Sequence, residues 1–129
     1  MTTDTNPSSH KVILVVEDDP FYSSIFHRKL SFEGFDVLLA SDGQQGIKVA
    51  CEKQPNLILL DMIMPVKDGI TTLKEMKADD SLKNIPVIIL SNLGQEENMK
   101  ETTDLGAVDY IVKSNMSVQE MVDKVKKYV

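Results

Sequence analysis

The chain alternates between short apolar runs and segments in which apolar residues recur three or four positions apart. Runs of adjacent apolar residues bounded by turn residues are typical of strands buried on both faces of a parallel sheet. Such runs occupy residues 12–16, 35–40, 57–60, 86–90 and 108–112. Each is followed by a segment with helical spacing. This alternation predicts an α/β fold with an open, doubly wound sheet of five parallel strands, covered by helices on both faces.

The helical segments differ in the strength of their pattern. In the last one, Ser117 and Glu120 form a capping box, and an apolar stripe follows at 3.6-residue spacing, made of Val118, Met121, Val122, Val125 and Val129. The segment 95–105 is instead mostly polar, and only Met99 and Leu105 are strongly apolar. We therefore expect its helix to be the least firmly packed.

The size and composition suit one globular domain, with 129 residues, 42% of them apolar and 26% charged. Residues 1–9 are polar and predict a disordered tail, which leaves residues 10–129 as the folded domain. The tail lacks the features of a secretory signal, and no apolar run approaches the ~20 residues that span a bilayer. The net charge of −6 disfavours a nucleic-acid surface. We expect direct contact with neither nucleic acid nor a membrane.

The single cysteine, Cys51, rules out an intrachain disulfide framework. With Ile47 and Ala50 it falls on the apolar face of a predicted helix, which favours a small buried side chain over a reactive thiol. A reducing, cytoplasmic setting fits this use of cysteine.

Polar side chains follow four of the five predicted strands. They are Glu17 and Asp18, Asp61, Ser91, and Lys113. Because parallel strands end at the same edge of a sheet, these side chains are expected to converge. Close carboxylates repel one another unless a cation shares the site, and oxygen ligands favour a hard cation such as Mg²⁺.

This set of side chains suits phosphoryl transfer, in which catalysis consists mostly of positioning and of stabilising the charge on the transferred group. Asp61 is the candidate nucleophile, which would attack phosphorus and carry an aspartyl phosphate. Lys113 would supply a positive charge opposite the metal, and Ser91 a hydroxyl donor.

Four pieces of sequence, in order, resemble the receiver domain of two-component response regulators. They are residues 13–19 (ILVVEDD), 61–69 (DMIMPVKDG), 86–91 (PVIILS) and 106–113 (GAVDYIVK). The resemblance covers residues 11–129 and implies a flavodoxin-like (βα)5 fold with strand order 2-1-3-4-5.

The resemblance also implies roles for single residues. Asp61 corresponds to the phosphoacceptor. The implied Mg²⁺ ligands are Asp18 directly, Glu17 through water, Asp61, and the backbone carbonyl of Ile63, with Asp19 outside the set. Ser91 corresponds to the hydroxyl residue that moves toward the phosphoryl group, and Tyr110 to the aromatic switch that follows it inward.

A protein of this family is a phosphorylatable switch that catalyses only its own phosphorylation and dephosphorylation. Its donor would be a sensor histidine kinase or a phosphotransfer protein, and it would signal to an effector protein that the sequence does not identify. The expected signalling surface is the fourth helix, the fifth strand and the last helix, through which the chain would be a monomer or a weak dimer. We expect a stand-alone receiver or a piece of a longer protein.

Two positions depart from the family pattern. Ser114 stands where the family usually has a proline joined to the lysine by a cis bond. A cis bond before a residue other than proline costs about 3–4 kcal/mol, so the geometry at Lys113 is open. Asn92 stands where a very small residue is common, and we expect it to alter the phosphoryl lifetime, which a comparison of decay rates with Asn92→Ala would test.

Two other functions stay open beside the switch. The first is a degenerate receiver that acts as an unphosphorylated binding module, which the departures at Asn92 and Ser114 allow and the intact acidic set opposes. The second is a Mg²⁺-dependent phosphatase of small molecules, against which stand Ile63, where a second acid would be needed, and the lack of a cap insertion. No glycine-rich phosphate loop supports nucleotide binding.

Overall fold

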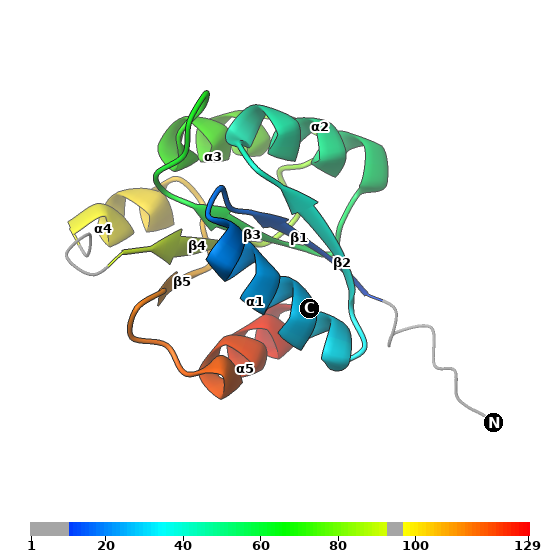
Figure 1. Cartoon of the computed structure of the whole chain (residues 1–129). Helices are drawn as coiled ribbons and strands as arrows, with labels where there is room; N and C mark the ends of the chain where they lie inside the picture. The colour runs from blue at the N-terminus through cyan, green and yellow to red at the C-terminus, as the bar shows by residue number, and fades with distance from the viewer. Residues whose placement is uncertain (1–10, 93–96) are drawn as a thin grey trace.

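The computed structural model describes residues 11–92 and 97–129, which fold into five parallel strands and five helices (Figure 1). The strands are β1 (Val12–Val16), β2 (Asp36–Ala40), β3 (Leu57–Asp61), β4 (Val87–Ser91) and β5 (Asp109–Val112). The helices are α1 (Pro20–Phe32), α2 (Gly43–Lys53), α3 (Gly69–Ala78), α4 (Glu97–Asp104) and α5 (Val118–Tyr128). The sheet order β2-β1-β3-β4-β5 confirms the predicted doubly wound topology.

Successive side chains of the central strands point to opposite faces of the sheet and contribute to two separate cores. Leu14 and Val16 of β1 pack with α2 and α3 through residues such as Ala50 and Leu73. Their neighbours on β1 point to the other face of the sheet, where Phe26 of α1 and residues of α5 complete the second core. Figure 1 shows the two helix pairs on opposite sides of the sheet. Every residue of β3 and β4 is buried, as the apolar runs predicted.

The helix ends agree with the sequence pattern. Both hydrogen bonds of the predicted capping box between Ser117 and Glu120 are present at the start of α5. Among the described side chains of α4, residues 99–104, only Thr102 is buried, which agrees with the expectation of a weakly packed helix. Residues 95–96 of the segment predicted for that helix lie outside the described residues, as does the predicted tail over residues 1–9.

The prediction that Cys51 is buried is wrong. Helix α2 turns Gly43, Gly46 and Ala50 to the core, and Cys51 lies beyond the edge of that face, exposed. Its Sγ lies 3.8 Å from Oδ2 of Asp79. Small residues bring the helix close to the sheet, because a Cβ on Gly46 would come within 2.8 Å of Val16 Cγ2. Helix α2 therefore packs on the sheet through the face that carries its glycines, and Cys51 lies outside this face.

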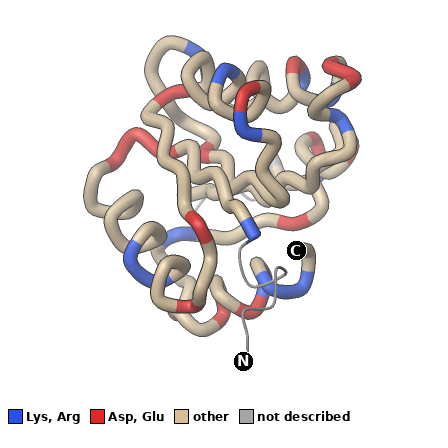
Figure 2. The backbone as a smooth tube through the Cα atoms, turned by 90° about the vertical axis from the view of Figure 1, so that its right-hand side faces the viewer, with Lys and Arg blue, Asp and Glu red and all other residues tan. Residues whose placement is uncertain are grey.

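Over the described residues, no helix combines the length and apolar character needed to cross a bilayer. Figure 2 shows Lys and Arg interspersed with Asp and Glu along the backbone. The structure therefore does not gather the chain's positive charges on one element.

Candidate functional site

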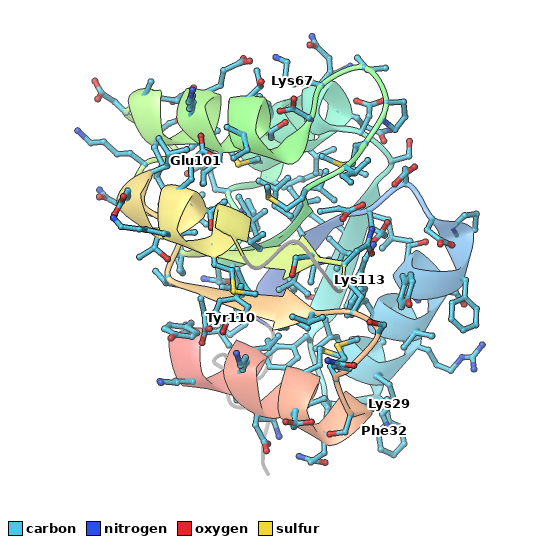
Figure 3. All side chains as sticks on the ribbon, turned by 90° about the vertical axis from the view of Figure 1, so that its left-hand side faces the viewer. Lys29, Phe32, Lys67, Glu101, Tyr110 and Lys113 are labelled. Atoms are coloured by element: carbon cyan, nitrogen blue, oxygen red, sulfur yellow. The ribbon has the colours of Figure 1, made fainter. Side chains whose placement is uncertain are left out.

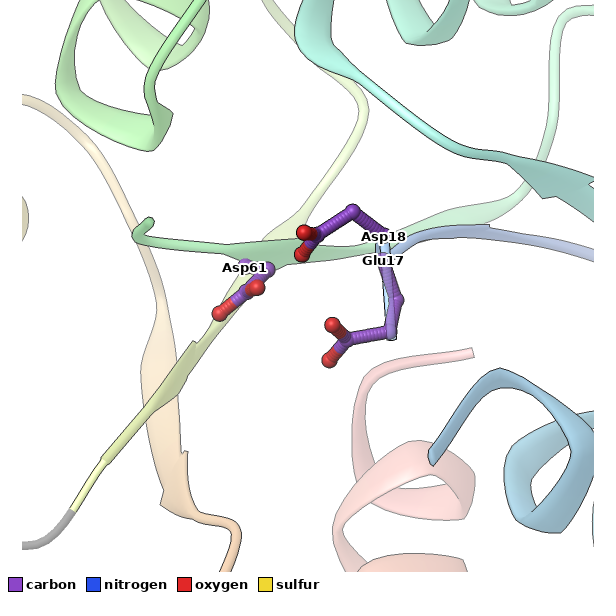
Figure 4. A group of neighbouring side chains, drawn as sticks. All are labelled: Glu17, Asp18 and Asp61. Carbon is purple, nitrogen blue, oxygen red and sulfur yellow. The ribbon is translucent and has the colours of Figure 1, made fainter. Parts of the chain in front are cut away.

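Three carboxylates meet at the carboxyl edge of the sheet. Glu17 and Asp18 directly follow β1, and Asp61 is the last residue of β3, which is hydrogen-bonded to β1 along its length. One carboxylate oxygen from each of the three residues lies within 4.8 Å of the others. Figure 4 shows the three side chains next to one another. Glu17 and Asp61 are buried and Asp18 is exposed, so the cluster opens to solvent on one side.

The turn from β1 into α1 holds the Glu17 carboxylate in place. Its Oε2 accepts a hydrogen bond from the backbone N–H of Asp19 at 3.0 Å. The side chain of Asp19 caps α1 by accepting from the N–H of Phe21 at 2.9 Å. Asp19 is thus a helix cap and is not one of the three acids of the cluster.

The loop from β3 to α3 fits tightly under Asp61. The N–H of Gly69 donates to the carbonyl of Met62 at 2.9 Å, and a Cβ at Gly69 would overlap the Asp61 carbonyl oxygen. Asp68 caps α3 by accepting from the N–H of Thr71 at 2.8 Å, so it serves the turn. The end of β3 can therefore approach the helix only because residue 69 is glycine.

Lys113 joins two of the carboxylates. It follows β5 and is buried, and its Nζ lies 2.7 Å from Glu17 Oε1 and 3.3 Å from Asp61 Oδ1. The described residues contain no cis peptide bond, so the Lys113–Ser114 bond is trans. Lys113 nevertheless reaches the acidic cluster, and the missing proline does not misdirect it.

Burial and charge shift the titration of this cluster. Burial of Asp61, reinforced by the nearby charge of Glu17, raises the pKa of its carboxyl from 3.8 to about 7, although Lys113 acts in the opposite direction. Burial alone would lower the pKa of Lys113, but its hydrogen bond to Glu17 and the charge of Asp61 outweigh this and raise it. One ammonium thus only partly offsets three carboxylates, and the site favours an added cation.

The donor set fits a hard divalent cation. The three acids offer only oxygen ligands, and their mutual repulsion is what a bound cation would relieve. Ile63, whose backbone carbonyl the resemblance adds to the ligands, lies two residues after Asp61 and is 59% exposed as a residue. The arrangement has the oxygen donors of a magnesium site.

Ser91, the last residue of β4, shares the edge of the sheet with these groups. Strand β4 lies between β3 and β5, and the carbonyl of Ser91 accepts from the N–H of Lys113 at 2.8 Å. Its buried hydroxyl donates a long hydrogen bond of 3.4 Å to the carbonyl of Ile111. Asn92 follows directly and is exposed. Ser91 is thus held near the acids with a side chain that is only weakly engaged.

Tyr110 lies apart from Lys113 (Figure 3). Its side chain is 38% exposed, and the ammonium of Lys124 from α5 lies 5.1 Å from its ring centroid. Lys124 also donates to the Tyr110 carbonyl at 2.7 Å. The ring is therefore on the surface formed by β5 and α5.

One residue beside the site, Tyr22, was not identified from the sequence. Tyr22, in the first turn of α1, has its ring centroid 4.7 Å from Lys113 Nζ. Along the sequence Tyr22 recurs at helical spacing with Ile25, Phe26 and Leu30, a pattern that indicates only an apolar helix face. In the structure the ring packs against the second core. The only signal was its place, four residues after Asp18 in the helix that begins at the site.

The family model described as "Response regulator receiver domain" matches residues 13–126. The chain therefore belongs to the receiver domains of two-component systems, which are signalling switches that interact with histidine kinases or phosphotransfer proteins. The acidic pocket of Glu17, Asp18 and Asp61 is typical of phosphorylation in this family.

Two curated relatives show the range of the family. Sporulation initiation phosphotransferase F of Bacillus subtilis is 35% identical over 117 residues, which cover 91% of this chain and 92% of that protein. The DNA-binding dual master transcriptional regulator RpaA of Synechocystis is 38% identical over 114 residues, which cover 88% of this chain. The matched part is only 47% of RpaA, so this chain spans about half the length of that relative.

A solved structure of a similar receiver domain contains a metal ion at its site. The receiver domain of a sensor histidine kinase from Pseudomonas aeruginosa PAO1 aligns with a TM-score of 0.84 and 26% identity, covering 92% of this chain and 97% of that one. That protein is described with a magnesium ion coordinated in its active-site cleft.

Proposed function

We propose that this chain is a phosphorylatable switch of a two-component phosphorelay, which accepts a phosphoryl group on Asp61 in a Mg²⁺-dependent reaction. The observation that carries the proposal is the geometry of Lys113, whose ammonium lies within 3.3 Å of Asp61 and 2.7 Å of Glu17 at the carboxyl edge of the sheet. The donor would be a sensor histidine kinase or a phosphotransfer protein.

In the transfer, an oxygen of Asp61 forms a bond to phosphorus while the bond from phosphorus to the donor's imidazole nitrogen breaks. The imidazole leaves with the electron pair of that bond, and the product is a mixed anhydride on Asp61. Asp18, Glu17 through water, Asp61 and the Ile63 carbonyl would hold Mg²⁺, which when bound supplies positive charge for the phosphoryl oxygens.

The chain's own residues supply the remaining stabilisation. The Lys113 ammonium lies beside Asp61 and would pair with a phosphoryl oxygen, which carries more charge than the carboxylate alone. The Ser91 hydroxyl donates only a 3.4 Å hydrogen bond in this structure, so exchanging the Ile111 carbonyl for a phosphoryl oxygen costs little. Ser91 would thus move toward Asp61 once the group is attached.

The conformational change at the site would be transmitted through β5. Movement of Ser91 opens space beside β5 that Tyr110 would enter, and this would change the surface of α4, β5 and α5 that an effector protein reads. The switch is a change in the populations of two conformations, biased by one charged group. Through the same surface the chain would be a monomer or a weak dimer.

The remaining features of the proposal follow the sequence. The folded domain comprises residues 10–129 behind a tail of residues 1–9, in a cytoplasmic protein that contacts neither nucleic acid nor membrane directly. An unphosphorylated binding module is the second candidate. The position of Lys113 favours the switch over it, because a module without phosphorylation has no need for a buried ammonium between two acids.

Intact-protein mass spectrometry after incubation with acetyl phosphate and Mg²⁺ tests the proposal. We expect one phosphoryl adduct, lost in Asp61→Asn and in a sample treated with a metal chelator. An unmodified protein despite Mg²⁺ binding would contradict the switch and favour the binding module. Adduct formation without metal would contradict the Mg²⁺ dependence.

A further inference from the structure

We infer that Tyr22 is a positioning residue for Lys113, whose aromatic face keeps the ammonium beside Asp61. The inference rests on the proposed phosphorylation of Asp61 and adds a residue to that site. It starts from a contact between two residues far apart in the sequence, the ring of Tyr22 and Nζ of Lys113, at 4.7 Å.

Three groups lie next to the Lys113 ammonium. Glu17 Oε1 lies at 2.7 Å, Asp61 Oδ1 at 3.3 Å, and the Tyr22 ring covers the ammonium from α1. An aromatic ring attracts a cation through its negative face, and the attraction is strongest where water is excluded. The Lys113 side chain is only 5% exposed, so this contact is a buried one.

Lys113 needs such a support because the hydrogen bond from its backbone N–H to the Ser91 carbonyl fixes the main chain and not the ammonium. Lysine carries its charge on a flexible four-carbon stem. The following residue, Ser114, has no ring to fix its backbone, and it is exposed. The direction of the ammonium must therefore come from its contacts.

The two carboxylates alone would not keep the Lys113 ammonium beside both of them. The shorter distance is to Glu17, so an ammonium that lost the ring would keep Glu17 and withdraw from Asp61. The ring opposes this withdrawal from a fixed position, since Tyr22 lies in the first turn of α1 behind the Asp19 cap and packs into the second core. Tyr22 would thus act through Lys113 without touching the phosphoryl group.

The chain offers a matched control on the same helix. Lys29 Nζ lies 5.4 Å from the ring centroid of Phe32, but this pair is at the far end of α1 and Phe32 is 80% exposed (Figure 3). Replacing Phe32 by leucine removes a similar cation–aromatic contact without approaching the site. Replacing Tyr22 by phenylalanine keeps the aromatic face and removes only the hydroxyl.

The experiment measures the phosphorylation rate with acetyl phosphate at saturating Mg²⁺ in the full chain. We expect Tyr22→Leu to lower the rate roughly 10-fold, Tyr22→Phe to stay within about 2-fold of the wild type, and Phe32→Leu to match it. A wild-type rate in Tyr22→Leu overturns the inference. An equal loss in Tyr22→Phe also overturns it, because the hydroxyl would then be the important group.

A second readout does not depend on phosphorylation. In a ¹³C-labelled wild-type protein, the Cε protons of Lys113 should be shifted upfield by the Tyr22 ring current, and the shift should persist in Tyr22→Phe. A wild type without this shift overturns the inference even where Tyr22→Leu does not fold. A wild type that shows the shift but takes no phosphoryl group contradicts the proposed function and leaves the contact intact.

Discussion

At the scale of single residues, the site combines groups that destabilise the protein when no ligand is bound. Asp61 is held beside Glu17 in a buried position, where a charged carboxylate is unfavourable. Lys113 offsets this only in part. If Asp61 is the phosphoacceptor that we propose, a bound cation would replace an unfavourable buried charge with a favourable interaction. The cost of burying Asp61 without a cation would then favour binding of a cation at the site.

The raised pKa of Asp61 predicts a pH-dependent effect on stability. Between pH 3.8 and about pH 7 the folded protein keeps a proton that the unfolded chain has released, so the free energy of unfolding falls as the pH rises through this range. Because solvent reaches the site, we expect Asp61→Asn to recover only about 1–2 kcal/mol at pH 8, and less at pH 5. Urea unfolding with a metal chelator measures this.

Asp80→Asn is the control for that experiment, because the Asp80 side chain is 95% exposed. It should change stability little at either pH. If Asp61→Asn raises the free energy of unfolding equally at both pH values, the effect does not come from the charge of Asp61.

Val66, in the loop between β3 and α3, has a strained backbone. Its φ is 69°, in the left-handed region that β-branched residues avoid, and the N–H of Lys67 donates back to the Pro65 carbonyl at 2.7 Å. Glycine adopts this conformation without a clash. We expect Val66→Gly to raise the free energy of unfolding by about 1 kcal/mol in denaturant titrations, while Val66→Ala gives no such gain. A loss of stability in the glycine variant would contradict the strain.

At the scale of secondary-structure elements, α5 is tied to β5 by polar contacts as well as by its core residues. Lys124 Nζ donates to Asp109 Oδ1 at 3.0 Å, and the Tyr128 hydroxyl lies 3.0 Å from Asp109 Oδ2. Burial opposes the charge on Asp109, but the N–H of Tyr110, Lys124 and Tyr128 outweigh it and lower its pKa. Of these groups, Lys124 also lies against the ring of Tyr110, with its ammonium 5.1 Å from the ring centroid.

Removing this tie should loosen α5. We expect Lys124→Met to lower the free energy of unfolding by about 1 kcal/mol in urea, because Asp109 and the Tyr110 carbonyl lose a charged donor. Lys100→Met serves as the control, since Lys100 pairs only with Asp104 on the surface of α4 among the described contacts. Equal effects of the two substitutions would contradict a special role of Lys124.

At the scale of the whole molecule, the edge of the sheet was predictable because it follows from strand order. Once the apolar runs predicted parallel strands, Glu17, Asp18, Asp61, Ser91 and Lys113 had to share one edge. The sequence did not reveal which way individual side chains turn. Cys51 lies just off the buried face of α2, and the Tyr22 ring reaches Lys113 across more than half of the chain, so neither position follows from local spacing.

The direction of the Lys113 side chain likewise could not be predicted from the sequence. From the sequence, Ser114 in place of proline left the direction of the lysine open. In the structure the bond between them is trans, and the buried ion pairs with Glu17 and Asp61 still form. The order of the strands predicted that Lys113 would share an edge with Glu17 and Asp61, but which oxygens its ammonium contacts depends on tertiary packing, which local spacing does not encode.

The most direct test of the central claim identifies the phosphorylated residue. After incubation with acetyl phosphate and Mg²⁺, borohydride reduction converts an aspartyl phosphate to homoserine, and peptide mass spectrometry then locates it. We expect homoserine at position 61, and none when the metal is chelated. Homoserine at another aspartate, or at none, would contradict the assignment of Asp61 as the phosphoacceptor.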